Sequence, residues 1–301
     1  MARRDTTTMF GHLAETLTLI SQGQPGHIVD TLIAERGGRM MRHPLWPVLR
    51  PFLYMLLRYD KAIEFADAVG GLPGFQVFEH LSQVLQLDLR VTGEERIPKT
   101  GGFLLVCNHP TGIADGVAVF DLMKHRRPDM MFFANRDAIR VNPRLSEIVI
   151  PVEWREEFKT KLKARETLQI TNQAIEEEKA TILFPSGRIA YWQNGKLNER
   201  PWKTSAVSMA RRYGLPLLPV HMTARNSTLF YWFARLANEL RDITVFHELL
   251  NKKRQRFELV VGDLIPIEHL EGDPAEVTRA LEFHSTHALA GDANARFVPL
   301  A

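Results

Sequence analysis

The residues best placed to do chemistry in this sequence are His109 and Asp115, in a loop that follows the apolar run 103–107. The run has the length and composition of a buried strand, and the loop after it contains Asn-His-Pro, Gly112 and Asp-Gly. Imidazole has an unperturbed pKa near neutrality, so His109 can accept a proton and return it. Asp115 can hold the ring in one tautomer and stabilise the imidazolium. From the residues alone, the alternative is a loop histidine beside an aspartate that caps the next helix.

A second candidate site follows another apolar run, 181–184, and consists of the turn residues Pro-Ser-Gly-Arg at 185–188. The guanidinium of Arg188 offers a planar fork that suits phosphate or carboxylate. Lys203 lies near the start of the next expected helix, whose amino end favours anions. The pattern indicates an anion-binding loop, and the alternative is an ordinary tight turn with a surface arginine.

Both loops follow strands, and open α/β sheets place their chemistry outside the carboxyl ends of the strands. From residue 87 onward, short apolar runs alternate with helical patterns, which predicts an α/β domain with a mixed, mostly parallel sheet flanked by helices. The seven expected strands are 88–92, 103–107, 130–134, 148–152, 181–184, 217–221 and 257–261. The expected helices lie near 116–125, 142–147, 156–178, 203–213, 227–250 and 274–289.

The part before this domain, 1–86, is expected to be helical and separate from the α/β domain of 87–301, with its first helix near 12–21. Segment 45–58 is apolar nearly all round, with Trp, Tyr and arginine at its edges. It is too short to span a bilayer and has the composition of a helix that lies in the headgroup region. A second helix at 74–87 is expected to form an antiparallel membrane-docking pair with it. The alternative is a buried core helix whose arginines extend to solvent.

Composition excludes several classes of protein. The chain has 301 residues with 38 Lys and Arg against 35 Asp and Glu, and no aromatic-basic interleaving, so we expect no nucleic-acid partner. The single cysteine, Cys107, excludes an internal disulfide and a paired-cysteine metal motif, and fits a reducing compartment. No apolar run reaches the roughly twenty residues of a membrane-spanning helix, and we expect no secretory signal.

Taken in order, the motifs resemble the glycerolipid acyltransferases, the family of the lysophosphatidic acid acyltransferases. The resemblance covers roughly residues 85–270. Its blocks are Asn108-His109 with Asp115, then 132–136 through 150–152, then Phe184-Pro185-Ser186-Gly187-Arg188, then the strand core 218–220.

Two departures from the family pattern resemble one branch of it. Family members have four residues between His and Asp, whereas this chain has five, and Ser186 and Arg188 replace the usual Glu and Thr of the third block. Both features, with Glu248–Lys253 before a late strand, are similar to ornithine-lipid, related aminolipid and hemolysin-type acyltransferases. The altered third block argues against a glycerol-3-phosphate backbone as the acceptor.

The resemblance implies a mechanism, in which His109 takes the proton of an acceptor hydroxyl as that hydroxyl attacks an acyl thioester and Asp115 orients the ring. Backbone N–H groups near Gly112 or Gly187 would bind the oxyanion. Arg188 and Arg136 would hold the acceptor's acidic headgroup or the donor's phosphopantetheine. The implied substrate-binding residues are Asn108, Gly112, Arg136, Ser186, Gly187, Arg188 and Lys203.

The implied donor is acyl carrier protein or acyl-coenzyme A, and the implied acceptor is a lyso-lipid such as lyso-ornithine lipid. We expect no metal and no cofactor beyond the thioester, and a peripheral, monotopic enzyme on the cytoplasmic face of a bacterial inner membrane. Basic patches would also attract an acidic carrier protein.

Four rival hypotheses remain. The first is a 1-acyl-glycerol-3-phosphate acyltransferase that makes phosphatidic acid. The second is a thioesterase or hydrolase with Cys107 as nucleophile and His109 as base, although a lone cysteine ending an apolar strand is more often core. The third is a peripheral lipid-binding protein without turnover. The fourth is a metal site of His109, Asp115 and His221, whose spacing matches no ligand motif.

Overall fold

The computed structural model describes residues 26–153 and 155–299, and the chain divides into two compact units. The first unit contains Met1–Leu72, Arg140–Asn142 and Ser227–Asn251; the second contains Pro73–Ile139, Pro143–Asn226 and Lys252–Ala301. This division differs from the expected boundary after residue 86, because the helix that begins at Gly74 belongs to the second unit and a late segment joins the first. The helix expected near 12–21 lies outside the described residues.

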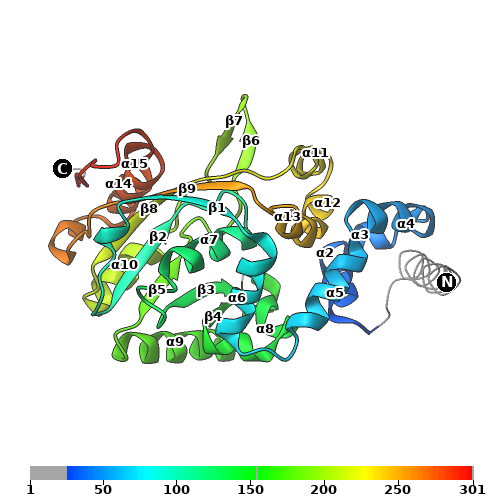
Figure 1. Cartoon of the computed structure of the whole chain (residues 1–301), viewed down its shortest axis with the longest axis horizontal. Helices are drawn as coiled ribbons and strands as arrows, with labels where there is room; N and C mark the ends of the chain where they lie inside the picture. Colours follow the sequence, from blue (N-terminus) through cyan, green and yellow to red (C-terminus); the bar gives the residue numbers. More distant parts are fainter. Residues whose placement is uncertain (1–25, 154, 300–301) are drawn as a thin grey trace, which may run out of the picture. The chain divides into compact units, whose positions relative to one another are not determined.

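A seven-stranded sheet forms the centre of the second unit (Figure 1). The strand order is β1 (Asp88–Thr92), β9 (Arg256–Val261), β8 (Leu217–Thr223), β2 (Phe103–Cys107), β5 (Ala180–Leu183), β3 (Met131–Asn135) and β4 (Val149–Val152). All neighbours pair in parallel except β8 and β9, which are antiparallel. The predicted mixed, mostly parallel α/β fold is confirmed, and each strand lies within about two residues of its expected bounds.

One face of the sheet is covered by α9 (Lys161–Glu176), α10 (Ser205–Tyr213) and α14 (Pro274–Phe283). Leu104 and Val106 of the fully buried β2 pack with Ala206 of α10 and Leu281 of α14 in one apolar cluster. Because β2 has layers on both faces, its sequence is a continuous apolar run rather than an alternating one.

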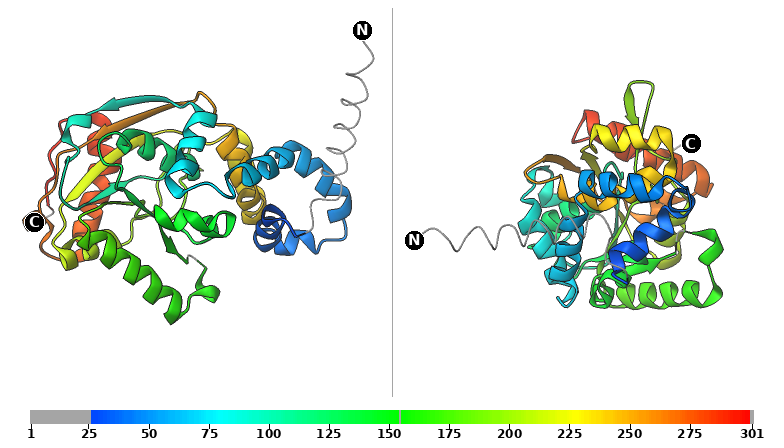
Figure 2. Two further views of the ribbon diagram at one scale, coloured as in Figure 1. Left: turned by 60° about the horizontal axis from the view of Figure 1, so that its bottom comes forward. Right: turned by 90° about the vertical axis from the view of Figure 1, so that its right-hand side faces the viewer.

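The other face of the sheet carries α6 (Gly74–Leu85) and α7 (Ile113–Met123), away from α9 (Figure 2). Phe78 of α6 stacks on Phe132 of β3, with 4.9 Å between ring centroids, and packs on Phe120 of α7. Ser82 of α6 donates a hydrogen bond of 2.6 Å to Asp121 of α7. These contacts explain why α6 belongs to the sheet's unit.

Several expected helices are shorter or interrupted. The helix expected over 156–178 begins only at Lys161, where the Thr160 hydroxyl caps the N–H of Lys163, and a 3-10 turn precedes it. The helix expected over 227–250 is three helices, because Ala237 is extended at φ −161° and Thr244 ends the second. The helices and turns not yet given are α8 (Asp137–Val141), η1 (Glu94–Arg96), η2 (Pro143–Glu147), η3 (Glu156–Phe158), η4 (Ile267–Leu270), the π-helical η5 (His284–Ala288) and α15 (Leu289–Gly291).

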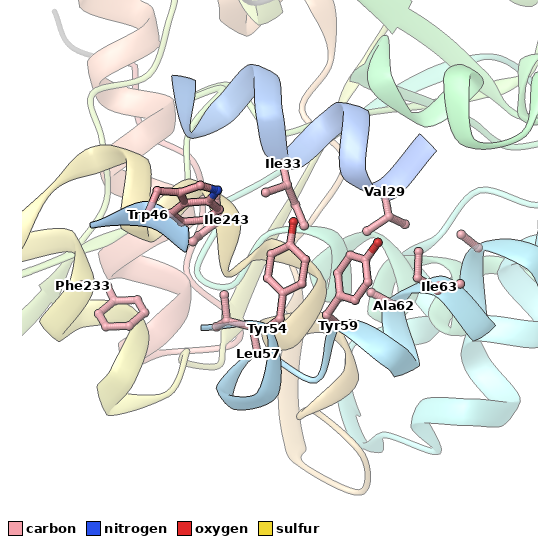
Figure 3. Packing of buried hydrophobic residues seen from close by; sticks show 11 residues of the cluster. Val29, Ile33, Trp46, Tyr54, Leu57, Tyr59, Ala62, Ile63, Phe233 and Ile243 are labelled. Carbon is pink, nitrogen blue, oxygen red and sulfur yellow. The ribbon is translucent and has the colours of Figure 1, made fainter. Parts of the chain in front are cut away.

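The first unit is all helical in its described part. Its helices are α2 (Ile28–Arg36), α3 (Gly38–Met41), α4 (Trp46–Leu56), α5 (Tyr59–Val69), α11 (Thr228–Leu236), α12 (Asn238–Ile243) and α13 (Val245–Leu250). Tyr54 of α4 stacks on Tyr59 of α5 with 4.1 Å between centroids, inside a core that also contains Trp46, Phe233 and Ile243 (Figure 3). Helices from both ends of the chain therefore share this core.

Helix α4 buries one side and exposes the other. Trp46 and Tyr54 are buried, whereas Val48, Phe52 and Met55 are 62%, 65% and 61% exposed. The neighbour of α4 is α5, while α6, the partner expected from the sequence, packs on α7 in the second unit. Among the described residues, no helix combines the length and apolar character needed to cross a bilayer.

A two-stranded hairpin, β6 (Tyr191–Gln193) and β7 (Lys196–Asn198), projects from the second unit (Figure 1). Its turn is Asn194-Gly195, and both residues have positive φ, 54° and 75°. That is the sequence preference of a two-residue hairpin turn. This hairpin was not among the elements predicted from the sequence, although Asn-Gly was its signal.

Candidate active site

The two candidate loops lie at the same edge of the sheet, because β2 and β5 are parallel neighbours. Their register pairs Val106 with Leu183, so the two strands end side by side. The Phe184 ring, just after β5, stacks on the His109 ring, just after β2, with 4.5 Å between centroids. Two motifs that are far apart in the sequence therefore form one site.

Asp115 is held by three hydrogen-bond donors from the loop before α7. Its carboxylate has no exposed surface. It accepts the N–H groups of Thr111 at 2.8 Å and of Gly112 at 2.9 Å, together with the Thr111 hydroxyl. The Gly112 contact is the side-chain half of a capping box, because Asp115 is the third residue of α7. These donors supply hydrogen bonds to carboxylate oxygens that are buried away from water.

The same carboxylate lies beside the imidazole of His109. Oδ2 of Asp115 is 2.9 Å from Nδ1 of His109, although the ring N–H is not aligned closely enough for a hydrogen bond. Nδ1 is buried and the His109 side chain is 18% exposed. Proton exchange with a substrate would therefore fall to Nε2. Asp115 both caps α7 and contacts His109, so it can be the helix-capping aspartate and the carboxylate that orients the histidine.

Gly112 occupies a position that requires glycine. Its φ and ψ are 102° and −124°, a region that side-chain-bearing residues rarely adopt. A Cβ at this position would lie 2.8 Å from Cδ1 of Ile189, which belongs to the turn after β5. The glycine therefore allows the two loops to approach each other.

Asn108 ties the His109 loop to β8. Its Nδ2 donates to the carbonyl of Met222 at 2.8 Å, and its Oδ1 accepts the N–H of Met222 at 2.7 Å. Both ends of the amide are engaged by backbone, which gives Asn108 a structural role. Its contact with a substrate stays a prediction.

Cys107, the alternative nucleophile, has no exposed surface. Burial, and then the nearby carboxylates of Asp115 and Glu199, raise the pKa of its thiol well above the usual range. The thiolate is the nucleophilic form of cysteine, so these surroundings disfavour the hydrolase hypothesis.

The turn after β5 gathers the cations predicted to bind an anion. Gly187 has φ 61° and donates its N–H to the carbonyl of Phe184 at 2.9 Å. Nζ of Lys203 lies 3.6 Å from the position that a Cβ would take on Gly187. Arg188 is exposed, whereas Ser186 is 3% exposed. Lys203 therefore lies beside the turn that contains Arg188.

The two glycine N–H groups expected near the oxyanion are already used. The N–H of Gly112 donates to Asp115, and that of Gly187 donates to Phe184. Neither N–H is available as an oxyanion donor in this arrangement, which corrects that expectation for these two groups.

Two further residues that the sequence suggested for the site, Arg136 and His221, contact residues outside the two loops. Arg136, at the end of β3, pairs through Nη1 with Glu166 of α9 at 2.9 Å, and its buried Nε and Nη2 have no hydrogen-bond partner within the described part of the chain. His221 on β8 contacts the carbonyl of Ser285 at 2.9 Å and the Thr223 hydroxyl at 3.1 Å. The metal-site hypothesis placed His221 beside His109, and these contacts direct its ring elsewhere.

One residue of the site was missed by the sequence analysis, namely Glu199, just after β7. Its two carboxylate oxygens accept the backbone N–H of His109, at 3.1 and 3.3 Å. Burial, opposed by a hydrogen bond from Ser186 and by the charge of His109, raises the pKa of Glu199 to about 7. No local pattern marks this residue, since it lies in the loop Asn-Glu-Arg-Pro.

A family model described as Acyltransferase matches residues 88–223, which include both loops and the hairpin. The comparisons support the resemblance to the glycerolipid acyltransferase family. The chain is an acyltransferase. The enzyme is 26% identical to a lyso-glycine lipid O-acyltransferase of Phocaeicola vulgatus, over 79% of this chain and 85% of that one. It is 25% identical to a lyso-glycine lipid O-acyltransferase of Bacteroides thetaiotaomicron, over 71% and 79%.

A solved structure, the 1-acyl-sn-glycerophosphate (LPA) acyltransferase PlsC from Thermotoga maritima, shares 15% identity with the enzyme. The TM-score is 0.48, with 94% of this chain and 93% of that one covered. This likeness is too distant to indicate an acceptor for the enzyme.

Proposed function

We propose that this enzyme is a lyso-lipid O-acyltransferase, which moves a fatty acyl group from a thioester to the hydroxyl of a lyso-lipid. The observation that carries the proposal is the 2.9 Å contact between His109 Nδ1 and the fully buried Asp115. A histidine oriented by an ionised carboxylate is the arrangement that activates a hydroxyl nucleophile.

In the proposed reaction, Nε2 of His109 takes the proton of the acceptor hydroxyl as its oxygen attacks the thioester carbonyl. The tetrahedral intermediate then collapses, the carbon–sulfur bond breaks, and the thiol leaves with the proton that His109 returns. Asp115 stabilises the imidazolium between these steps. The products are an ester of the acceptor and the free thiol, so atoms and charges balance.

For the acceptor we propose a lyso-aminolipid, a lipid with a free hydroxyl and an amino-acid headgroup. Both relatives in the comparison are named for lyso-glycine lipid, and the sequence resemblance indicated lyso-ornithine lipid. Arg188 and Lys203 supply two cations beside the turn after β5, which suits a carboxylate headgroup. Arg136, two of whose nitrogens have no hydrogen-bond partner among the described residues, is a further candidate for the headgroup or the donor's phosphate.

For the donor we propose acyl carrier protein or acyl-coenzyme A, with no further cofactor, because a thioester is already activated for acyl transfer. These donors belong to the cytoplasm, so we place the enzyme on the cytoplasmic face of a bacterial inner membrane.

We further propose that α4 contacts the bilayer. Val48, Phe52 and Met55 are spaced four and three residues apart, so these exposed side chains share one face of the helix.

The test of the reaction is transfer of labelled acyl groups from acyl carrier protein and from acyl-coenzyme A to a panel of acceptors. The panel contains lyso-glycine lipid, lyso-ornithine lipid and lysophosphatidic acid, with His109→Ala as the blank. Label in either aminolipid that disappears in the variant supports the proposal. Label in phosphatidic acid alone would reject the acceptor but keep the chemistry. Lipid binding without transfer by the folded enzyme would favour the non-catalytic alternative.

The test of membrane contact is flotation with vesicles that contain anionic phospholipid. Replacing Val48, Phe52 and Met55 together by serine should abolish flotation while leaving the unfolding temperature unchanged, since these side chains are exposed. Phe283→Ser in the second unit, where the side chain is 62% exposed, is the matched control and should still float. Equal flotation of both variants would exclude α4 as the docking element.

A further inference from the structure

The base of the β6–β7 hairpin holds both sides of the His109 backbone. Just before β6, the N–H of Ala190 donates to the carbonyl of His109 at 2.9 Å. Just after β7, the carboxylate of Glu199 accepts the N–H of His109 at 3.1 and 3.3 Å. Residues on either side of the hairpin therefore fix the N–H and the carbonyl of His109.

Glu199 also faces the charged and polar groups of the site. The Ser186 hydroxyl, from the turn after β5, hydrogen-bonds to the carboxylate and to the Arg188 carbonyl, so its one proton has two acceptors. His109, after β2, attracts the negative charge, and Asp115, on α7, repels it. Burial is the largest influence, and the pKa of Glu199 is raised to about 7. The carboxylate of Glu199 thus gains or loses its charge near neutral pH, close to His109.

We propose that Glu199 is a positioning residue for the transfer reaction, whose ionised carboxylate fixes the His109 backbone and stabilises the imidazolium that His109 forms. The inference rests on the proposed function, because it concerns the same histidine. Glu199 acts through His109 and Ser186 and touches no reacting atom.

A purely structural role does not require a charge. A single backbone N–H needs one acceptor, which a neutral glutamine oxygen provides as well. Holding an ionised carboxylate in a half-buried site opposes folding, because burial disfavours the charged form. The buried carboxylate of Glu199 therefore points to a function of the negative charge, which a glutamine variant removes with little change of shape.

The experiment compares Glu199→Gln and Glu199→Asp with the wild type in steady-state acyl transfer, with kcat, KM and the pH profile as readouts. Glu199→Gln should lower kcat roughly tenfold, because the negative charge that stabilises the imidazolium is lost while an acceptor for the His109 N–H remains, with little change in the acceptor KM. Glu199→Asp should recover part of the loss. Without the negative charge the imidazolium is less stable, so the acid limb of the Glu199→Gln profile should lie at lower pH and be less steep.

Ser186→Ala is the second variant, because it leaves Glu199 in place and removes only the hydroxyl. The Ser186 hydrogen bond lowers the pKa of Glu199, so its loss should move the acid limb to higher pH, opposite to the glutamine variant. Glu271→Gln is the matched control, since this glutamate is exposed, and it should change neither kcat nor the profile.

The outcomes separate this inference from the proposed function. An inactive wild type would overturn the proposed function. An active wild type with Glu199→Gln within about twofold of it, and with an unmoved acid limb, would overturn the role of Glu199 alone. If the glutamine variant does not fold, the Ser186→Ala profile decides, and an acid limb that stays in place would reject the inference.

Discussion

Replacing Gly112 by alanine tests whether the loop before α7 must approach the turn after β5 this closely. The added methyl group would lie 2.8 Å from Cδ1 of Ile189, and φ is 102°. The backbone conformation alone costs about 1–3 kcal/mol for a residue with a side chain. Forcing a methyl group into a packed contact costs about another 1–3 kcal/mol. We expect Gly112→Ala to lower the free energy of unfolding by roughly 2–6 kcal/mol.

Gly272→Ala is the matched control, because its φ is 98° and nothing lies within 4 Å of the added methyl group. Gly272→Ala should therefore lose only the free energy that the unfavourable backbone conformation costs. Since 1 kcal/mol shifts the unfolding temperature by about 2–4 °C in a domain of this size, Gly112→Ala should unfold about 2–12 °C below Gly272→Ala. In the Ile189→Ala background, Gly112→Ala should have only the backbone cost, because the side chain that it would contact is absent.

Acyl transfer should also fall in Gly112→Ala, by about tenfold or more, because the N–H of Gly112 helps to hold Asp115 against His109. Calorimetry and the transfer assay measure the two effects on the same preparations. Equal unfolding temperatures for the two alanine variants, with transfer unchanged, would refute the reasoning.

Three further predictions concern the carboxylates and the thiol. Asp115→Asn should lower kcat about a thousandfold or more with little change in KM, because the amide cannot stabilise the imidazolium; a loss below about tenfold in the transfer assay would contradict this. Cys107→Ala should keep kcat within about twofold, since the buried thiol stays protonated, and a folded but inactive variant would contradict it. The pKa of Glu199 is raised from 4.5 to about 7 by burial, so the folded state is stabilised below pH 4.5 and loses this stabilisation as the pH rises through 7. Glu199→Gln should therefore unfold at a higher temperature than the wild type at pH 8 but not at pH 5, and a lower temperature at pH 8 would contradict it.

The strands were predictable because a strand buried on both faces of the sheet is a continuous apolar run in the sequence. A run such as 103–107 has no polar position, and loop residues follow it at once. Helix ends were less predictable, because they depend on single backbone conformations. The extended residue Ala237 divides the segment 227–250, and nothing in its apolar pattern marks the break.

The site was predictable where one loop carries it and not where distant segments meet. His109 lies just before α7 and Asp115 in its first turn, six residues further on, and their types alone suggested a pair. Glu199 reaches His109 only because the hairpin folds back on the loop, a contact across ninety residues that no local pattern encodes. Asn108 was predicted to contact a substrate, yet both ends of its amide are held by the backbone of β8.

The capping of α7 by Asp115 has a consequence for how this enzyme can change. The hydrogen bonds that begin the helix also set the carboxylate against the imidazole. The same few contacts therefore serve folding and the proposed reaction, and a substitution that loosens the helix start also displaces the carboxylate from the proposed base, His109. Substitutions that change the acceptor without disturbing the helix start are therefore expected outside this loop, for example in the turn after β5, where Arg188 is exposed.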